Sequence, residues 1–185
     1  MAIGRQQPQW LTQKKLLFEY LVYLLEQWRL NSHPNLTGFF SKLKLQKVLF
    51  LVASVNATKE YHPLLEVFNK FYALPYGPVE IDIYEAMKRS EFNNIRFEGN
   101  ECEQTLNESQ FLDLNESLKS AMNTSLQAIK DMGVDYITML PFELVSITHK
   151  WTSWQVAMRV AEMLGNRREY MSTEDIYNST VKAFK

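Results

Sequence analysis

The sequence predicts a mainly α-helical protein: a single compact domain of about seven helices with at most one small β ribbon. The chain has 185 residues, of which 46% are hydrophobic and 22% charged, which suffices for one core without disulfide or metal staples. Apolar residues recur at helical spacing, and glycine or proline separates the helical segments. We expect residues 1–185 to form this domain, with residues 1–9 as a flexible N-terminal extension.

The first two helices are predicted from periodicity and from a capping residue. Residues 10–30 contain no glycine or proline and carry one largely apolar stripe. The stripe comprises Trp10, Lys14, Leu17, Leu21, Leu24 and Trp28. A loop is expected at 31–40, after which Ser41 should cap a second helix that runs to about Asn56.

The middle of the chain predicts two short extended segments around a turn and a helix. Residues 64–74 are rich in aromatic and β-branched side chains, which favours a short extended segment. Residues 75–78 form a turn, and Pro78 suits the first turn of a helix over 79–90, where its missing N–H costs little. A second short strand is expected at 92–97, before an acidic, polar stretch.

Four further helices are predicted toward the C-terminus. Gly133 and Gly165 should end the first and third of them. Capping-box spacing precedes the last two, in Thr152 with Gln155 and in Ser172 with Asp175. The four helices span residues 109–131, 141–148, 153–164 and 173–184.

The charge is nearly balanced overall but unevenly distributed. The net charge of the chain is −1, with +5 over residues 1–60, −5 over 61–130 and −1 over 131–185. Oppositely charged surfaces could meet or be solvated, or the split could face a partner. A nucleic-acid footprint would need a denser basic stripe than Lys42, Lys44 and Lys47 provide, so we do not expect nucleic-acid binding.

The residue types that carry enzyme chemistry do not form a recognisable constellation. The single cysteine, Cys102, lies between two glutamates that disfavour its thiolate. The three histidines have no metal-ligand spacing. Glu80 and Asp82, two residues apart on the predicted helix, should not share a face. We therefore expect no enzyme activity, no cofactor and no metal site.

The sequence gives no indication of secretion or of membrane insertion. The N-terminus is polar, and the first apolar run, residues 16–25, is interrupted by Glu19 and is too short to span a bilayer. One cysteine cannot form an internal disulfide, which suits a reducing compartment. A cytoplasmic protein without a membrane partner is expected.

Three short segments stand out by their chemistry. They read LKLQKVLFL (43–51), FYALPYGPVEIDIYEAM (71–87) and ELVSITHKWTSW (143–154). Lys47 could extend to solvent, or be held at a partner surface or against a carboxylate. Gly77 should permit a backbone geometry or close approach that a side chain would block. His149 should be a hydrogen-bonded structural residue or a cation at a helix C-terminus.

These segments resemble the SocA-like antitoxins, the Panacea domain of bacterial and phage toxin–antitoxin pairs. The sequence departs from the family pattern at Leu74-Pro75, at Val145 and at Ser153, which stands where the family has a proline. The resemblance implies ten motif residues, whose division between scaffold and partner contact stays open. They are Lys47, Phe50, Tyr76, Gly77, Pro78, Val79, Tyr84, Thr148, His149 and Trp154.

The resemblance implies an antitoxin that neutralises a cognate toxin by direct binding, the toxin being encoded by a neighbouring gene. Because toxins of the family are diverse, the domain does not identify the toxin. One alternative is a DNA-binding regulator of its own operon, although the sequence offers no added helix-turn-helix. A second alternative is an uncharacterised enzyme. Self-association stays open.

Overall fold

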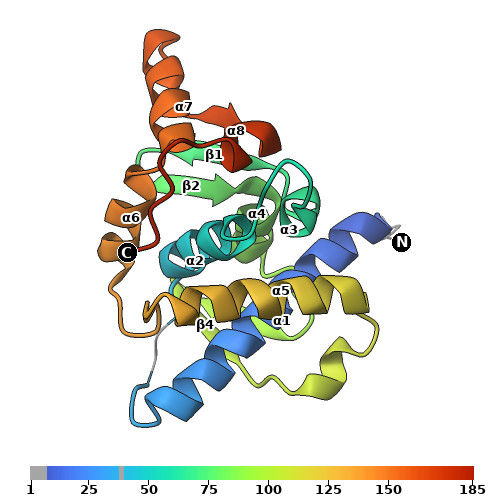
Figure 1. The fold of residues 1–185 in the computed structure, drawn as a ribbon. Coiled ribbons are helices and arrows are strands. Elements are labelled where there is room, and N and C mark those ends of the chain that lie inside the picture. Colours follow the sequence, from blue (N-terminus) through green and yellow to red (C-terminus); the bar gives the residue numbers. More distant parts are fainter. Residues whose placement is uncertain (1–7, 38–39) are drawn as a thin grey trace, which may run out of the picture.

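The computed structural model describes residues 8–37 and 40–185, which form a mixed α/β fold (Figure 1). Eight α-helices are accompanied by two small antiparallel sheets, of three and two strands, in these residues. The prediction of a mainly helical protein with at most one ribbon is therefore wrong. The predicted flexible extension lies outside the described residues up to position 7, whereas Gln9 already belongs to the first helix.

Helices make up most of the elements; β1–β2 and β3–β4 are consecutive pairs of strands, and β5 stands alone near the C-terminus. In chain order they are α1 (Gln9–Ser32), α2 (Lys42–Ser54), α3 (Pro63–Val67), β1 (Phe71–Leu74), β2 (Gly77–Glu80), α4 (Ile81–Arg89), β3 (Ile95–Glu98), β4 (Glu101–Gln104), the 3₁₀ helix η1 (Glu108–Phe111), α5 (Glu116–Asp131), α6 (Pro141–His149), α7 (Thr152–Met163), β5 (Glu169–Met171) and α8 (Thr173–Tyr177).

Helix α2 is the central element of the fold. Every residue from Lys44 to Ser54 is buried, and a helix enclosed on all sides must lie within the core. It lies between the β1–β2 hairpin and α5, with α6 alongside (Figure 1). The prediction that Ser41 caps this helix is confirmed, since its hydroxyl accepts a 3.2 Å hydrogen bond from the Lys44 amide.

The three-stranded sheet has the order β2-β1-β5, so β2 is an edge strand. Pro78 lies inside this strand, opposite Ala73, and the helix that was expected to begin at Pro78 begins at Ile81 instead. An edge position accepts proline because its missing N–H is not needed for pairing. Strand β5, which sequence reasoning missed, pairs Met171 with Phe71 across about 100 residues of chain.

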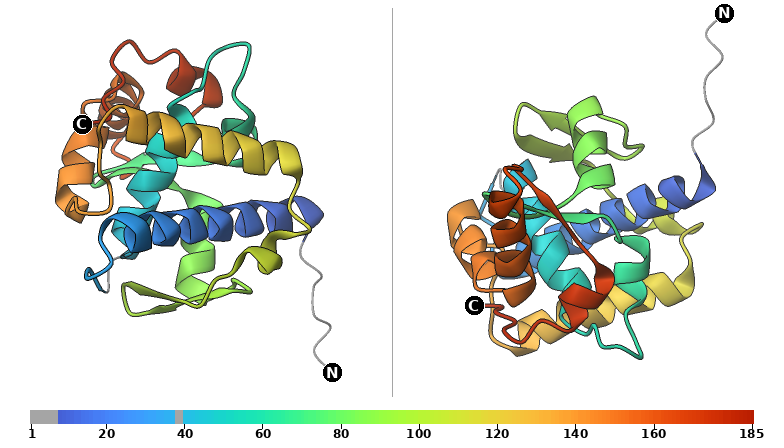
Figure 2. Two further views of the ribbon diagram at one scale, coloured as in Figure 1. Left: turned by 60° about the horizontal axis from the view of Figure 1, so that its bottom comes forward. Right: turned by 90° about the horizontal axis from the view of Figure 1, so that it is seen from above.

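The second sheet is the β3–β4 hairpin, and Figure 2 shows α1 lying between this hairpin and α5. The strand expected at 92–97 corresponds to β3, and β4 falls in the acidic, polar stretch that follows it. Ile95 and Phe97 alternate inward along β3, whereas β4 is exposed at Glu101 and Glu103. Without an alternating apolar pattern, β4 leaves no strand signal in the sequence.

Several predicted helix boundaries also need correction. Residues 64–74 form α3 and then β1 rather than one extended segment, and η1 and a break precede α5. The capping box at Ser172 is present, but that of Thr152 is not, because Trp151 is the N-cap of α7.

The last predicted helix ends early, at Tyr177. The chain then runs back along α6 (Figure 1). There the Ala183 carbonyl accepts a 2.7 Å hydrogen bond from the Trp151 indole, and the Phe184 carbonyl accepts one of 3.0 Å from the Tyr136 hydroxyl. These side-chain contacts, rather than helix hydrogen bonds, hold the C-terminal segment.

Among the residues that the structure describes, no helix is both long and apolar enough to cross a membrane.

Candidate functional site

Lys47 is the only lysine among the ten motif residues, and it is buried. Its side chain extends from α2 toward the edge strand, with 0% of the residue exposed. The ammonium donates a 2.6 Å hydrogen bond to the carbonyl oxygen of Pro78. Burial lowers the pKa of Lys47 to about 7. Lys47 therefore does not extend to solvent, and it forms no ion pair with a carboxylate of the described residues, which were two of the roles that the sequence left open. It joins a helix to a strand.

Gly77 is where the three motif segments meet. Its φ of +90° belongs to a region that side chains rarely adopt. A Cβ at this position would lie 2.5 Å from the Thr148 hydroxyl oxygen and 3.0 Å from Cε of Lys47. The expected close approach is therefore present, and it is made by side chains from α2 and α6. Thr148 is itself fixed by a 2.9 Å hydrogen bond from its hydroxyl to the Val145 carbonyl.

His149 and Trp154 form a stacked pair next to this junction. Their ring centroids are 3.8 Å apart and their planes are inclined by 11°. The Trp154 indole donates a 3.0 Å hydrogen bond to the Leu74 carbonyl, which ties α7 to the end of β1. Burial, together with the charge of Lys47, lowers the pKa of His149, and a hydrogen bond with the Pro75 backbone opposes this shift.

Phe50 lies in the core, one turn along α2 from Lys47. Its ring meets the rings of Phe71 and Trp151 edge-on, with centroid distances of 5.3 and 4.9 Å. Such aromatic pairs contribute roughly 0.5–1.5 kcal/mol beyond their buried area. Phe50 is thus a packing residue that holds β1 and α6–α7 against the central helix.

A pocket of about 440 Å³ opens beside this junction, between the start of α2, the β1–β2 turn and α4. Four of the ten motif residues line it: Lys47, Tyr76, Val79 and Tyr84. We call it the motif pocket. Its complete lining is Lys42, Leu43, Gln46, Lys47, Leu74, Pro75, Tyr76, Val79, Tyr84, Lys88 and Asn100.

Exposed apolar side chains lie at the edge of the motif pocket. Tyr76, at the β1–β2 turn, is 63% exposed, and so is Phe142 of α6. The two rings meet edge-on with centroids 6.0 Å apart, and we call them the aromatic pair. Leu140, two residues before Phe142, is 67% exposed. Large apolar side chains that gather on a surface, rather than scatter singly, indicate an interaction site.

Sequence reasoning missed two further polar residues of α2 that organise the site. The Gln46 side chain accepts a 2.9 Å hydrogen bond from the Glu80 amide and donates one of 3.3 Å to its carbonyl, which replaces the strand partner that the edge of β2 lacks. The Lys44 ammonium donates hydrogen bonds of 2.7 and 2.9 Å to the carbonyl oxygens of Ile137 and Met139. Polar residues within an otherwise apolar helix were the available signal.

Glu80 and Asp82 come together on Lys14, contrary to the expectation that they would not share a face. Glu80 ends the strand rather than belonging to the helix, and both carboxylates lie 2.7 Å from the Lys14 ammonium. Burial raises the pKa of Glu80, and the charge of Lys14 opposes this shift. A lysine on the apolar stripe of α1 was the sequence signal for this network, which anchors α1 to the end of β2 and the start of α4.

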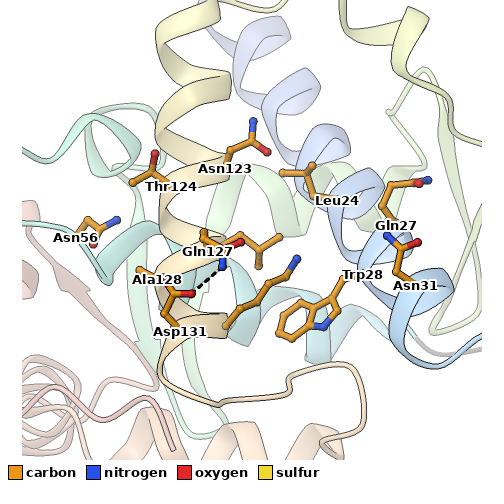
Figure 3. A pocket seen from close by; sticks show the side chains of 12 residues that line it. Leu24, Gln27, Trp28, Asn31, Asn56, Asn123, Thr124, Gln127, Ala128 and Asp131 are labelled. Atoms are coloured by element: carbon orange, nitrogen blue, oxygen red, sulfur yellow. Dashed lines mark hydrogen bonds between the residues drawn. The ribbon is translucent and has the colours of Figure 1, made fainter.

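A larger pocket of about 550 Å³ lies between α1 and α5 (Figure 3). Carboxamide side chains and the Trp28 ring line much of it. The Lys130 ammonium covers that ring, 4.8 Å from its centroid. The Gln127 amide donates a 2.7 Å hydrogen bond to the Asp131 carboxylate, which is the dashed line in Figure 3. The described part of its lining includes none of the motif residues.

Comparison with known proteins agrees with the position of the motifs. A family model described as "Antitoxin SocA-like, Panacea domain" matches residues 45–155, which is more than half of the chain and contains all ten motif residues. No curated protein and no solved structure matches the chain.

Proposed function

The chain belongs to the SocA-like antitoxin family, and on that premise we propose that it neutralises a cognate toxin by binding it directly. The proposed role is binding without catalysis. The toxin would be the product of a neighbouring gene, and its toxicity would be blocked by occupation of its surface rather than by a reaction.

The aromatic pair is the observation that best supports direct binding. Tyr76 and Phe142 come from two motif-bearing elements, and each exposes 63% of its surface although the core beside them is closely packed. Aromatic side chains are enriched at the centres of protein interfaces, where a few residues supply most of the binding free energy. A fold that fixes two such rings edge to face on its surface has a preformed contact site.

Coexpression tests the proposal. The neighbouring open reading frame is induced alone and together with this chain, and growth is followed. Complex formation between the purified proteins is then measured by calorimetry. We expect toxicity of the neighbour alone, rescue by this chain, and a stable complex. A neighbour that is harmless, or harmful but not rescued, would contradict the antitoxin role, and rescue without a complex would contradict direct binding.

Substitution of the aromatic pair locates the contact. The variant Tyr76→Ala/Phe142→Ala should keep the melting temperature but bind the toxin at least tenfold more weakly, because exposed side chains contribute little to folding. Leu112→Ala is the matched control, since Leu112 is 74% exposed and lies outside the site. If both variants behave alike, the aromatic pair is not the contact site.

A further inference from the structure

The motif pocket has the shape and chemistry of a receptor for an apolar side chain. Its walls are largely apolar, formed by Leu43, Leu74, Pro75 and Val79 together with two tyrosine rings. Its volume of about 440 Å³ falls within the range of ordinary ligand pockets. The side chains of Gln46 and Lys47 make their hydrogen bonds to the β2 backbone, so the inner wall of the pocket is rigid.

The charged residues that line the motif pocket are all lysines. Lys42, Lys47 and Lys88 line it, and no Asp or Glu does so among residues 8–37 and 40–185. Lys42 lies 5.6 Å over the Phe97 ring, and Lys88 lies over Tyr84 and 3.3 Å from Glu85. Since an exposed ion pair of this kind contributes little free energy, Lys88 can exchange Glu85 for a carboxylate of a partner.

The surroundings of the pocket favour a short protein segment over a nucleic acid. Asn100, which lines the pocket, lies at the tip of the β3–β4 hairpin between Glu98 and Glu101. These carboxylates would repel a continuous phosphate backbone, which binds through extended basic surfaces. They would tolerate one or two carboxylates placed at the lysines. The pocket is also continuous with the aromatic pair through Tyr76, so an occupant can extend onto that surface.

We propose that the motif pocket binds a short acidic segment of the toxin, in which an apolar side chain enters between Leu43, Val79 and Tyr84 while adjacent carboxylates contact Lys42 and Lys88. This inference rests on the proposed function and names the chemistry of the toxin surface that is recognised. Charge complementarity of this kind selects partners and accelerates association.

Charge reversal at the rim tests the inference with the intact toxin. The affinity of Lys42→Glu/Lys88→Glu should fall at least tenfold, and its dependence on salt should become weaker. The control Lys59→Glu/Arg167→Glu changes the net charge equally at two exposed positions that do not line the pocket, and it should bind as the unmodified chain does. Equal losses in both variants, or no loss in either, would overturn the inference although the toxin still binds.

Photo-crosslinking identifies the segment directly. Benzoylphenylalanine is introduced at Tyr84 in the pocket or at Leu112 as a control, and the crosslinked toxin peptide is read by mass spectrometry. We expect a crosslink from position 84 to a peptide with an apolar residue beside Asp or Glu. A basic or uncharged peptide, or crosslinking only from position 112, would refute the inference. Absence of any complex with the unmodified chain would instead refute the proposed function and the inference with it.

Discussion

The ammonium of Lys47 lies 2.6 Å from the carbonyl oxygen of Pro78, so a buried lysine joins the central helix to the edge strand of the sheet. Burying an ammonium without an opposite charge is costly. The absent side chain of Gly77 makes room for the lysine stem, since a Cβ there would lie 3.0 Å from Cε. The lysine, the glycine and the proline of the motifs are thus parts of one contact.

Replacing Gly77 by alanine should destabilise the protein strongly. The substitution forces alanine into a φ of +90° and places Cβ 2.5 Å from the Thr148 hydroxyl oxygen. Backbone strain of about 1–2 kcal/mol and overpacking of about 1–3 kcal/mol should together lower the free energy of unfolding by about 2–5 kcal/mol. Urea denaturation measures this change.

The control for that substitution is Gly165→Ala. Gly165 has a φ of +69°, but a Cβ there meets nothing within 4 Å, so only the backbone cost of about 1–2 kcal/mol applies. Thr148→Ala in the Gly77→Ala background should recover part of the loss by removing the clashing oxygen. Equal losses at the two glycines would show that the junction is not tightly packed.

The free energy of unfolding should depend on pH through Lys47. Its folded pKa is about 7 whereas an ordinary lysine has 10.5, so between these values the unfolded chain binds a proton that the folded chain does not. The contribution of Lys47 to the free energy of unfolding is therefore highest above pH 10.5 and falls as the pH is lowered from 10.5 to about 7. Within this range the change is up to about 1.4 kcal/mol per pH unit.

Lys47→Met isolates this dependence from that of other titrating groups. The unfolding free energies of both proteins are measured in urea at pH 7, 8 and 9, and the difference between them is compared. The free energy of unfolding of the unmodified protein should increase relative to that of the variant as the pH rises, because methionine cannot titrate. A difference that is constant with pH would mean that Lys47 keeps an ordinary pKa when buried.

His149 should titrate below the ordinary histidine value of 6.5, because burial and the nearby Lys47 charge both disfavour its protonation. Proton NMR of the imidazole measures this pKa. In Lys47→Met the pKa of His149 should rise, since the repelling ammonium is gone. An unchanged value would show that the two groups do not interact electrostatically.

The network around Lys14 should contribute more to stability than surface ion pairs do. Lys14→Met leaves Glu80, which is fully buried, and the largely buried Asp82 without their shared cation. We expect a loss of about 3–5 kcal/mol in the free energy of unfolding. Lys119→Met is the control, because its partner Glu116 is 82% exposed, and it should cost under about 1 kcal/mol. Comparable losses would contradict the role assigned to the network.

The candidate site could be predicted from the sequence only in part. The three motif segments were recognisable, and the close approach at Gly77 followed from the residue type. That Lys47 contacts the Pro78 carbonyl, 31 residues away, was not predictable, because a lysine on a helix has the same local pattern whether it meets solvent, a carboxylate or a backbone oxygen. The motif pocket likewise depends on α2, the hairpin and α4 being placed together.

The sequence by itself determined the helices at residues 10–30, 41–56, 141–148 and 153–164 and the membership of the family, because periodicity, helix breakers and motifs are local. Tertiary structure decided β2, β4 and β5. Pro78 entered an edge strand instead of starting a helix because β1 and Lys47 satisfy that backbone. β5 forms against β1 through contacts about 100 residues apart. Strands such as β4 and β5 are stabilised by their partners and by burial, which their own local sequence does not encode.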